Sequence, residues 1–192
     1  MFDRLTAVAA PLPIANVDTD MVIPARFMKA LSRTGLGRHL FQELRYTPDG
    51  GEREDFVLNR GATRGAQILI ADRNFGCGSS REHAVWALRD FGIRCVIAPS
   101  FGDIFSNNAR KNGLLLIRLP AAICDRLRDE VALAQFAPMT VDLADQRLTL
   151  ASGESIEFAI DPDDRRTLLD GRDDIARTLR HEAAIARFET AA

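Results

Sequence analysis

The stretch "QILIADRNFGCGSSREHAVWALRDFGIRCVIA" (residues 67–98) contains two short apolar runs, separated by a glycine- and serine-rich turn and an amphipathic segment. The runs at 67–71 and 94–98 are almost continuously apolar, which is typical of strands covered on both faces. Residues 80–91 are predicted to form a helix. A strand, a helix and a second strand in this order predict a parallel β-α-β unit.

The same alternation continues on the C-terminal side of this unit. The pattern predicts helices at 102–112 and 122–135 and a strand at 113–117. Residues 139–150 alternate between apolar and polar types around a polar turn, which predicts a hairpin, and 155–160 extends it by another strand. The sequence therefore predicts an α/β fold with a largely parallel central sheet.

The remaining segments predict less regular structure. Residues 36–44 suggest a short amphipathic helix, and the polar stretch 47–55, with Pro, Asp and two Gly, predicts a loop. A helical C-terminal extension is expected at about 163–190. Because no internal repeat or linker interrupts the chain, we expect a single domain over residues 1–192.

Composition excludes several classes of function. The 192 residues are 46% apolar and carry a net charge of −2, so the chain lacks the basic field that nucleic-acid binding requires. Its three cysteines have no close spacing, which argues against a disulfide framework and against a metal or iron–sulfur site built by this chain alone. Residues 5–15 are faintly signal-like, but Pro11 and Pro13 interrupt them and no apolar stretch is long enough for a membrane span. We expect a cytoplasmic protein with no nucleic-acid or membrane partner.

The turn "FGCGSSREHA" (75–84) has three interpretations. Ser79 and Glu82 fit a capping box, with Gly76 and Gly78 supplying positive φ in a tight turn. The turn fits a dinucleotide-binding motif less well, because Arg81 occupies the position at which G-x-G-x-x-G needs its third glycine. The third interpretation is a carboxylate site, in which the helix N-terminus and the Arg81 fork hold the anion.

A second marked stretch is "NVDTDMVIP" (16–24). Asp18 and Asp20 could act as an acid/base pair, as metal ligands or as turn formers, and two aspartates at this spacing are most often turn formers. Cys77 is more typical of a small turn residue than of a nucleophile. His83 stands alone, since the other two histidines are distant in sequence, so no metal-binding set is visible.

Taken together, the stretches 16–29 and 72–88 closely resemble the small subunit of bacterial 3-isopropylmalate dehydratase, in the aconitase superfamily. The likeness continues through "TGLGRHLFQELRY", "IAPSFGDIFSNNARKNGLL" and "LLDGRDDIARTLRHEAAIARFE". It implies an aconitase swivel-like domain with β/β/α layers. It also implies a hydro-lyase that interconverts 2-isopropylmalate and 3-isopropylmalate through 2-isopropylmaleate in leucine biosynthesis. A large subunit would carry a four-iron four-sulfur cluster, and this chain would bind no cofactor or metal.

The resemblance also implies roles for individual residues. Ser79 matches the base that removes the carbon-bound proton, and Ser80 and Arg81 match groups that hold a substrate carboxylate. Asp20 matches an acid of the active-site wall. Gly76, Gly78 and His83 match residues that support the site from behind.

The segment after the aspartates departs from the aconitase pattern, which presents a further arginine to a third carboxylate. Here the segment reads "PARFMKAL", and Arg26 is a candidate replacement. Phe27 and Met28, with Leu31, are candidates for an apolar pocket around the isopropyl group, and ordinary core packing is the competing interpretation. Alternative functions are the small subunit of a related hydratase, acting on citramalate/citraconate, dimethylmalate or homoaconitate, or a non-catalytic carboxylate-binding module.

Overall fold

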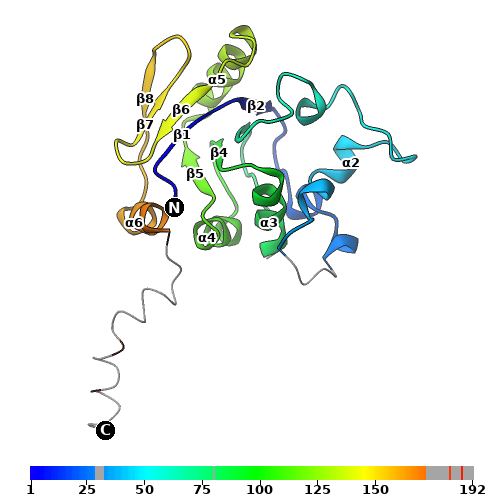
Figure 1. The fold of residues 1–192 in the computed structure, drawn as a ribbon, viewed down its shortest axis with the longest axis horizontal. Helices are drawn as coiled ribbons and strands as arrows, with labels where there is room; N and C mark the ends of the chain where they lie inside the picture. Colours follow the sequence, from blue (N-terminus) through cyan, green and yellow to red (C-terminus); the bar gives the residue numbers. More distant parts are fainter. Residues whose placement is uncertain (29–32, 80, 172–181, 183–186, 188–192) are drawn as a thin grey trace.

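The computed structural model describes residues 1–28, 33–79, 81–171, 182 and 187, and these residues form two four-stranded sheets flanked by helices (Figure 1). One sheet is parallel, in the order β2-β3-β4-β5, and its strands are Ala9–Leu12, Ile68–Ala71, Cys95–Ala98 and Leu115–Arg118. The other sheet is antiparallel, in the order β1-β6-β7-β8, and its strands are Arg4–Ala7, Met139–Asp142, Arg147–Thr149 and Ser155–Glu157. The prediction of a largely parallel central sheet is confirmed.

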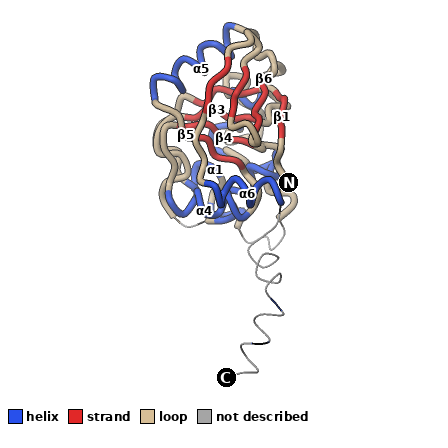
Figure 2. The backbone as a smooth tube through the Cα atoms, turned by 90° about the vertical axis from the view of Figure 1, so that its left-hand side faces the viewer, coloured by secondary structure: helices blue, strands red, loops and turns tan. Residues whose placement is uncertain are grey.

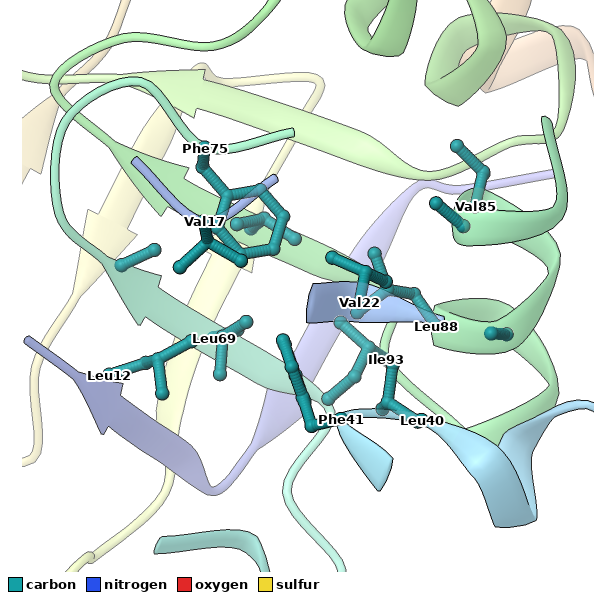
Figure 3. Close-up of a cluster of buried hydrophobic side chains, with 14 of the residues drawn as sticks. Leu12, Val17, Val22, Leu40, Phe41, Leu69, Phe75, Val85, Leu88 and Ile93 are labelled. Atoms are coloured by element: carbon teal, nitrogen blue, oxygen red, sulfur yellow. The ribbon is translucent and has the colours of Figure 1, made fainter. Parts of the chain in front are cut away.

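The parallel sheet separates two hydrophobic clusters, because alternate residues of each strand point to opposite faces. Leu69 and Val96 belong to the cluster that packs against α3 (Glu82–Phe91) and α4 (Asp103–Lys111). The first half of the chain also contributes to this cluster, and Figure 3 shows the side chains of Val17, Leu40 and Phe41 pointing into it.

The opposite face of the parallel sheet packs against α5 (Ala121–Leu133) and the antiparallel sheet. Ile70 and Ile97 belong to this second cluster, together with Cys124 of α5 and Val141 of β6. Figure 2 shows the strands in the middle of the molecule, with α5 at one end and α1 (Thr19–Val22), α4 and α6 (Pro162–Asp170) at the other. The layers are therefore helix, sheet and sheet, as the resemblance implied.

The N-terminal strand serves both sheets. β1 pairs with β6, and after the single residue Val8 the chain continues as β2, which pairs with β3. The two sheets thus share one continuous stretch of backbone, visible in blue in Figure 1.

The remaining helices are short. They are α1 (Thr19–Val22), α2 (Gln42–Arg45) and α6 (Pro162–Asp170). The predicted amphipathic helix at 36–44 is wrong as one element: a 3-10 turn at Gly37–His39 precedes α2, and Phe41 between them has a φ of +50°. Phe41 is completely buried, so packing of its ring outweighs the continuity of a helix.

The other predicted strands and helices up to residue 160 are confirmed with shifts of one to three residues at their ends, the largest in β8, which ends at Glu157 rather than at 160. The expected hairpin is β6 and β7, and β8 extends it. Of the C-terminal helix expected at about 163–190, the described part is α6, which begins beside its cap Asp161 and ends before Gly171. The rest of that prediction lies outside the described residues, apart from 182 and 187.

Candidate active site

The glycine-serine turn lies where β3 ends and α3 begins, at the carboxyl end of the parallel sheet. The backbone N–H of Phe75 donates to the carbonyl of Ser100 (3.0 Å), and that of Gly76 donates to the carbonyl of Val17 (2.7 Å). The turn is thereby fixed between the segment after β2 and the segment after β4. This is the edge at which open α/β sheets bind their ligands.

The two turn glycines have the backbone conformation that the sequence predicts. Gly76 has a φ of +73° and Gly78 a φ of +88°, values that other residues rarely adopt. At Gly76 there is also no room for a side chain, because an added Cβ would lie 2.2 Å from Cγ of Phe105. Gly76 is therefore required twice, by its conformation and by the close approach of α4.

The Asp-Thr-Asp stretch meets this turn through Thr19. Its backbone N–H donates to the carbonyl of Cys77 (3.0 Å), and its hydroxyl donates to the carbonyl of Ser79 (3.1 Å). Asp18 caps α1 by accepting from the N–H of Met21 (2.7 Å), so its interpretation as a turn former is correct. Sequence reasoning missed Thr19, for which the only signal was a hydroxyl residue between two marked aspartates.

Asp20 and Arg81 form an ion pair at the mouth of the turn. The Arg81 side chain is only 20% exposed, so its guanidinium is well held, whereas Asp20 is 54% exposed. Ser79 is exposed beside them, and its hydroxyl has no hydrogen-bond partner among the described residues. Ser80 lies outside the described residues. The structure thus places a free hydroxyl next to a paired arginine.

The capping-box interpretation of Ser79 and Glu82 is wrong. α3 begins only at Glu82, and Arg81 occupies the N-cap position without a side-chain cap hydrogen bond. The Glu82 carboxylate instead accepts from the side-chain amide of Asn112 (2.7 Å), at the end of α4. Within the described residues, no side chain caps the N–H groups of the first turn, so the positive end of the helix dipole is available at the turn.

His83 lies on α3 behind the turn. Its ring packs at a tilt against Trp86, with centroids 4.6 Å apart, and the indole N–H of Trp86 donates to the Asn112 side chain (3.0 Å). Asn112 therefore ties both Glu82 and Trp86 to α4, a role that sequence reasoning missed. In the part of the chain that is described, no group of three or more His, Cys, Asp or Glu residues could hold a metal ion.

Arg26, Phe27 and Met28 follow α1 but are not joined to the turn by any described contact. Arg26 forms an ion pair with Glu43 (2.6 Å) and lies over the Phe27 ring, with its Cζ 4.7 Å from the centroid. Phe27 also stacks on the ring of His39, with centroids 3.8 Å apart, and packs against the first hydrophobic cluster, as the core-packing interpretation expects. Met28 is half-buried. Leu31, the third apolar candidate, lies outside the described residues.

No described helix is long and apolar enough to cross a membrane. The charged groups that the turn presents are the Asp20–Arg81 ion pair and the positive end of α3. Such a set can hold a carboxylate and stabilise negative charge on a nearby oxygen.

The layered fold and this turn define the C-terminal domain of the aconitase class. The family model described as Aconitase C-terminal domain matches residues 1–122, and the model LeuD_N matches residues 125–162. In fold, the chain is similar to the crystal structure of 3-isopropylmalate dehydratase (leuD) from Methanocaldococcus jannaschii. The TM-score is 0.70 at 24% identity, over 96% of this chain and 98% of that one.

Closer relatives specify the family within that class. The chain is 61% identical to the 3-isopropylmalate dehydratase small subunit of Granulibacter bethesdensis, over 98% of this chain and 90% of the relative. It is 59% identical to that of Paramagnetospirillum magneticum, over 98% of this chain and 94% of the relative. The chain belongs to the family of 3-isopropylmalate dehydratase small subunits.

Proposed function

We propose that this chain is the small subunit of a heteromeric isopropylmalate isomerase. With its large subunit it interconverts 2-isopropylmalate and 3-isopropylmalate by removing and re-adding water, a step of leucine biosynthesis in the cytoplasm. The observation that carries the proposal is the junction of Asp20, Ser79 and Arg81 at the uncapped start of α3. Membership of the small-subunit family supports it.

Ser79 is the proposed base. Its exposed hydroxyl would take the proton from the substrate carbon as an alkoxide and return it in the reverse direction. A serine alkoxide is a demanding base, so it needs donors and positive charge fixed close by. The N-terminus of α3 and the guanidinium of Arg81 supply both.

Arg81 is the proposed anchor for a substrate carboxylate. Its guanidinium is held by Asp20, so the fork is oriented before the substrate arrives. A carboxylate can then be bound by two parallel N–H donors, with Ser80 as a further donor beside it. Asp20 is proposed as the acid of the active-site wall, and Gly76, Gly78 and His83 as residues that support the turn.

The rest of the site is assigned to the large subunit. Its four-iron four-sulfur cluster would polarise the substrate hydroxyl that leaves as water. The exposure of Ser79 supports this division, because a base for carbon acids needs a covering surface that excludes water, and this chain alone leaves the hydroxyl open.

The apolar pocket for the isopropyl group is proposed around Phe27 and Met28. Arg26 would contribute there through its place beside Phe27, with its charge neutralised by Glu43 rather than presented to a third carboxylate. An apolar pocket without a free cation suits an isopropyl group and disfavours a charged arm.

The experiment that tests this proposal is turnover of the co-purified complex with Ser79→Ala. Because the Ser79 hydroxyl makes no hydrogen bond to a described residue, the substitution should leave thermal stability unchanged while turnover falls by about a thousandfold or more, as expected for loss of a general base. Ser152→Ala, in the exposed hairpin, is the matched control and should retain full activity. If Ser79→Ala keeps more than a few per cent of the rate, Ser79 is not the base.

The division of labour has its own measurement. Purified alone, this chain should be folded, colourless and inactive on 2-isopropylmalate, and activity should appear on adding the iron-loaded large subunit. A brown preparation of this chain alone, with the visible absorbance of an iron–sulfur cluster, would contradict the assignment of the cluster to the partner.

A further inference from the structure

A cavity of about 470 Å³ lies on the far side of α4 from the glycine-serine turn. Its walls are α4, the edge strand β5 and the segment that leads into α6, and Figure 1 shows α4 and α6 side by side. The residues that line it are Ser106, Arg110, Leu114, Leu116, Arg118, Ala159, Ile160, Asp161, Asp164 and Leu168. Its volume falls in the range of small-molecule sites.

Both acids of the cavity already have partners. Asp164 forms an ion pair with Arg110 (3.4 Å). Burial nevertheless raises the pKa of Asp164. Asp161 caps α6, accepting from the N–H groups of Asp163 and Asp164 (2.8 and 3.2 Å).

Arg118 differs from the other charged groups of the cavity. It stands at the end of β5, where its guanidinium donates to the Ser106 hydroxyl (3.3 Å) and lies 5.8 Å from the centre of the Phe101 ring. Among the described residues, no carboxylate lies within ion-pair distance of it. The Ser106 hydroxyl donates its own proton to the carbonyl of Gly102 (3.0 Å), so it is not free to bind a ligand. The charged group left to recognise a ligand is the Arg118 guanidinium, which interacts with Asp164 only at longer range.

The remaining wall of the cavity is apolar. Leu116 lies on β5, and Leu114 directly precedes that strand. Ile160 lies in the segment before α6, and Leu168 lies on α6 itself. These branched side chains form a surface that favours an apolar body next to the charged end of a ligand.

We propose that this cavity binds a small carboxylate with a branched apolar body. The Arg118 guanidinium holds the carboxylate, and the leucine and isoleucine side chains contact the body. The site is separate from the turn, because α4 meets the turn through Gly102, whose N–H donates to the carbonyl of Phe75 (2.9 Å), and through Phe105, and neither residue lines the cavity. The cavity lies beyond, at Ser106 and Arg110.

The proposal is tested by calorimetric titration of the full chain with 4-methylpentanoate. We expect saturable one-to-one binding, with a Kd in the low millimolar range or tighter. Arg118→Gln should weaken it by about tenfold or more, since a charge-assisted hydrogen bond is lost, while circular dichroism stays unchanged. Acetate, which lacks the apolar body, should bind at least about tenfold more weakly. The amine 3-methylbutylamine, with a similar body and the opposite charge, should not bind.

Arg81→Gln is the control that separates this cavity from the substrate site, and it should bind 4-methylpentanoate like the wild type. Each of the following outcomes overturns the proposal: no binding at about 10 mM ligand, equal binding by Arg118→Gln, equal binding of the amine, or loss of binding in Arg81→Gln. The test needs no turnover, so it stands whether or not Ser79 is the base.

Discussion

Asp20 and Arg81 illustrate how one ion pair can prepare a site for a ligand. The arginine is largely covered and the aspartate is half exposed, so the pair can share the guanidinium with an incoming carboxylate without losing its own contact. An arginine has five N–H donors in a planar fork, which allows this sharing. A lysine has a single ammonium and cannot serve two planar carboxylates in the same way.

Arg81→Lys should therefore weaken substrate binding in the assembled enzyme. We expect kcat/KM for 3-isopropylmalate to fall by about ten- to a hundredfold, corresponding to loss of about 1.5–3 kcal/mol of charged hydrogen bonding. The measurement is steady-state kinetics of the complex, with Arg38→Lys, an exposed arginine of the segment before α2, as the matched control. An unchanged KM would show that the carboxylate is held elsewhere.

Gly76 allows a second test at the residue scale. Gly76→Ala places a Cβ against Phe105 and forces a positive φ on alanine, so we expect the free energy of unfolding to fall by about 2–4 kcal/mol. Gly153→Ala is the matched control: its φ is +88°, but nothing lies within 4 Å of the added Cβ, so only the conformational cost of about 1–2 kcal/mol remains. Urea unfolding measures both, and equal losses would show that contact with Phe105 is unimportant.

At the scale of elements, the side chain of Asn112 adds hydrogen bonds to the apolar packing between α3 and α4. Asn112 accepts from the indole of Trp86 and donates to Glu82 and to the carbonyl of Asn108 (2.8 Å). The start of α3 is consequently tied to the end of the next helix, and none of the described side chains caps it. This connection explains how α3 can begin without a capping box.

Asn112→Ala should loosen the start of α3. We expect a loss of about 1.5–3 kcal/mol in the free energy of unfolding, because Glu82 and Trp86 both lose a partner. The emission of Trp86, the single tryptophan of the chain, should shift at the same time. Asn107→Ala, on the exposed face of α4, is the control. It should change the free energy of unfolding by no more than about 0.5 kcal/mol and should leave the emission of Trp86 unshifted. If Asn112→Ala changes neither the free energy of unfolding nor the emission of Trp86, Asn112 does not hold the start of α3.

The elements of the parallel sheet could be predicted from sequence because their apolar runs are continuous and their turns contain glycine. The prediction of one helix over residues 36–44 failed although their apolar spacing fits a helix. Burial of Phe41 and the close approach of Gly37 to Phe91 interrupt the helix there. Local spacing carries no information about a partner fifty residues away. For the same reason the sequence did not reveal the role of Asn112, whose partners Glu82 and Trp86 lie on another helix.

The candidate site was predictable to a similar extent. The chemistry-bearing residues stood out as rare types in small turns, and Asp20 and Arg81 are indeed brought together. The hydrogen bonds of Thr19 that join the two stretches were not predictable, because a buried hydroxyl looks like any other threonine in sequence. Roles within the reaction came from resemblance rather than from spacing.

At the scale of the whole molecule, the cysteines report on the second hydrophobic cluster. Cys95 on β4 and Cys124 on α5 are both buried between the layers, and burial raises the pKa of each thiol, to about 11 for Cys124. Cys77 in the turn is half-buried. Thiol reactivity should therefore distinguish an intact core from an open one.

A native chain at pH 8 should react rapidly with a thiol reagent at one position, Cys77, and at all three in denaturant. Cys77→Ser should abolish the rapid phase, and its persistence would contradict the burial of the other two. Because the folded pKa values of Cys95 and Cys124 are raised, unfolding releases protons above the unfolded thiol pKa of about 8.5, so the free energy of unfolding should fall as pH rises beyond that value.

The continuous stretch of β1 and β2 affects when each sheet can form during synthesis of the chain. Arg4–Ala7 are synthesised more than 130 residues before their partners in β6, Met139–Asp142. Ala9–Leu12 must likewise wait for Ile68–Ala71. β1 thus remains without its sheet partner while the intervening residues are made, and the second hydrophobic cluster, to which the hairpin contributes Met139, Val141 and Leu148, cannot close before that hairpin has emerged. The first cluster is drawn from residues that precede the hairpin and can close without it.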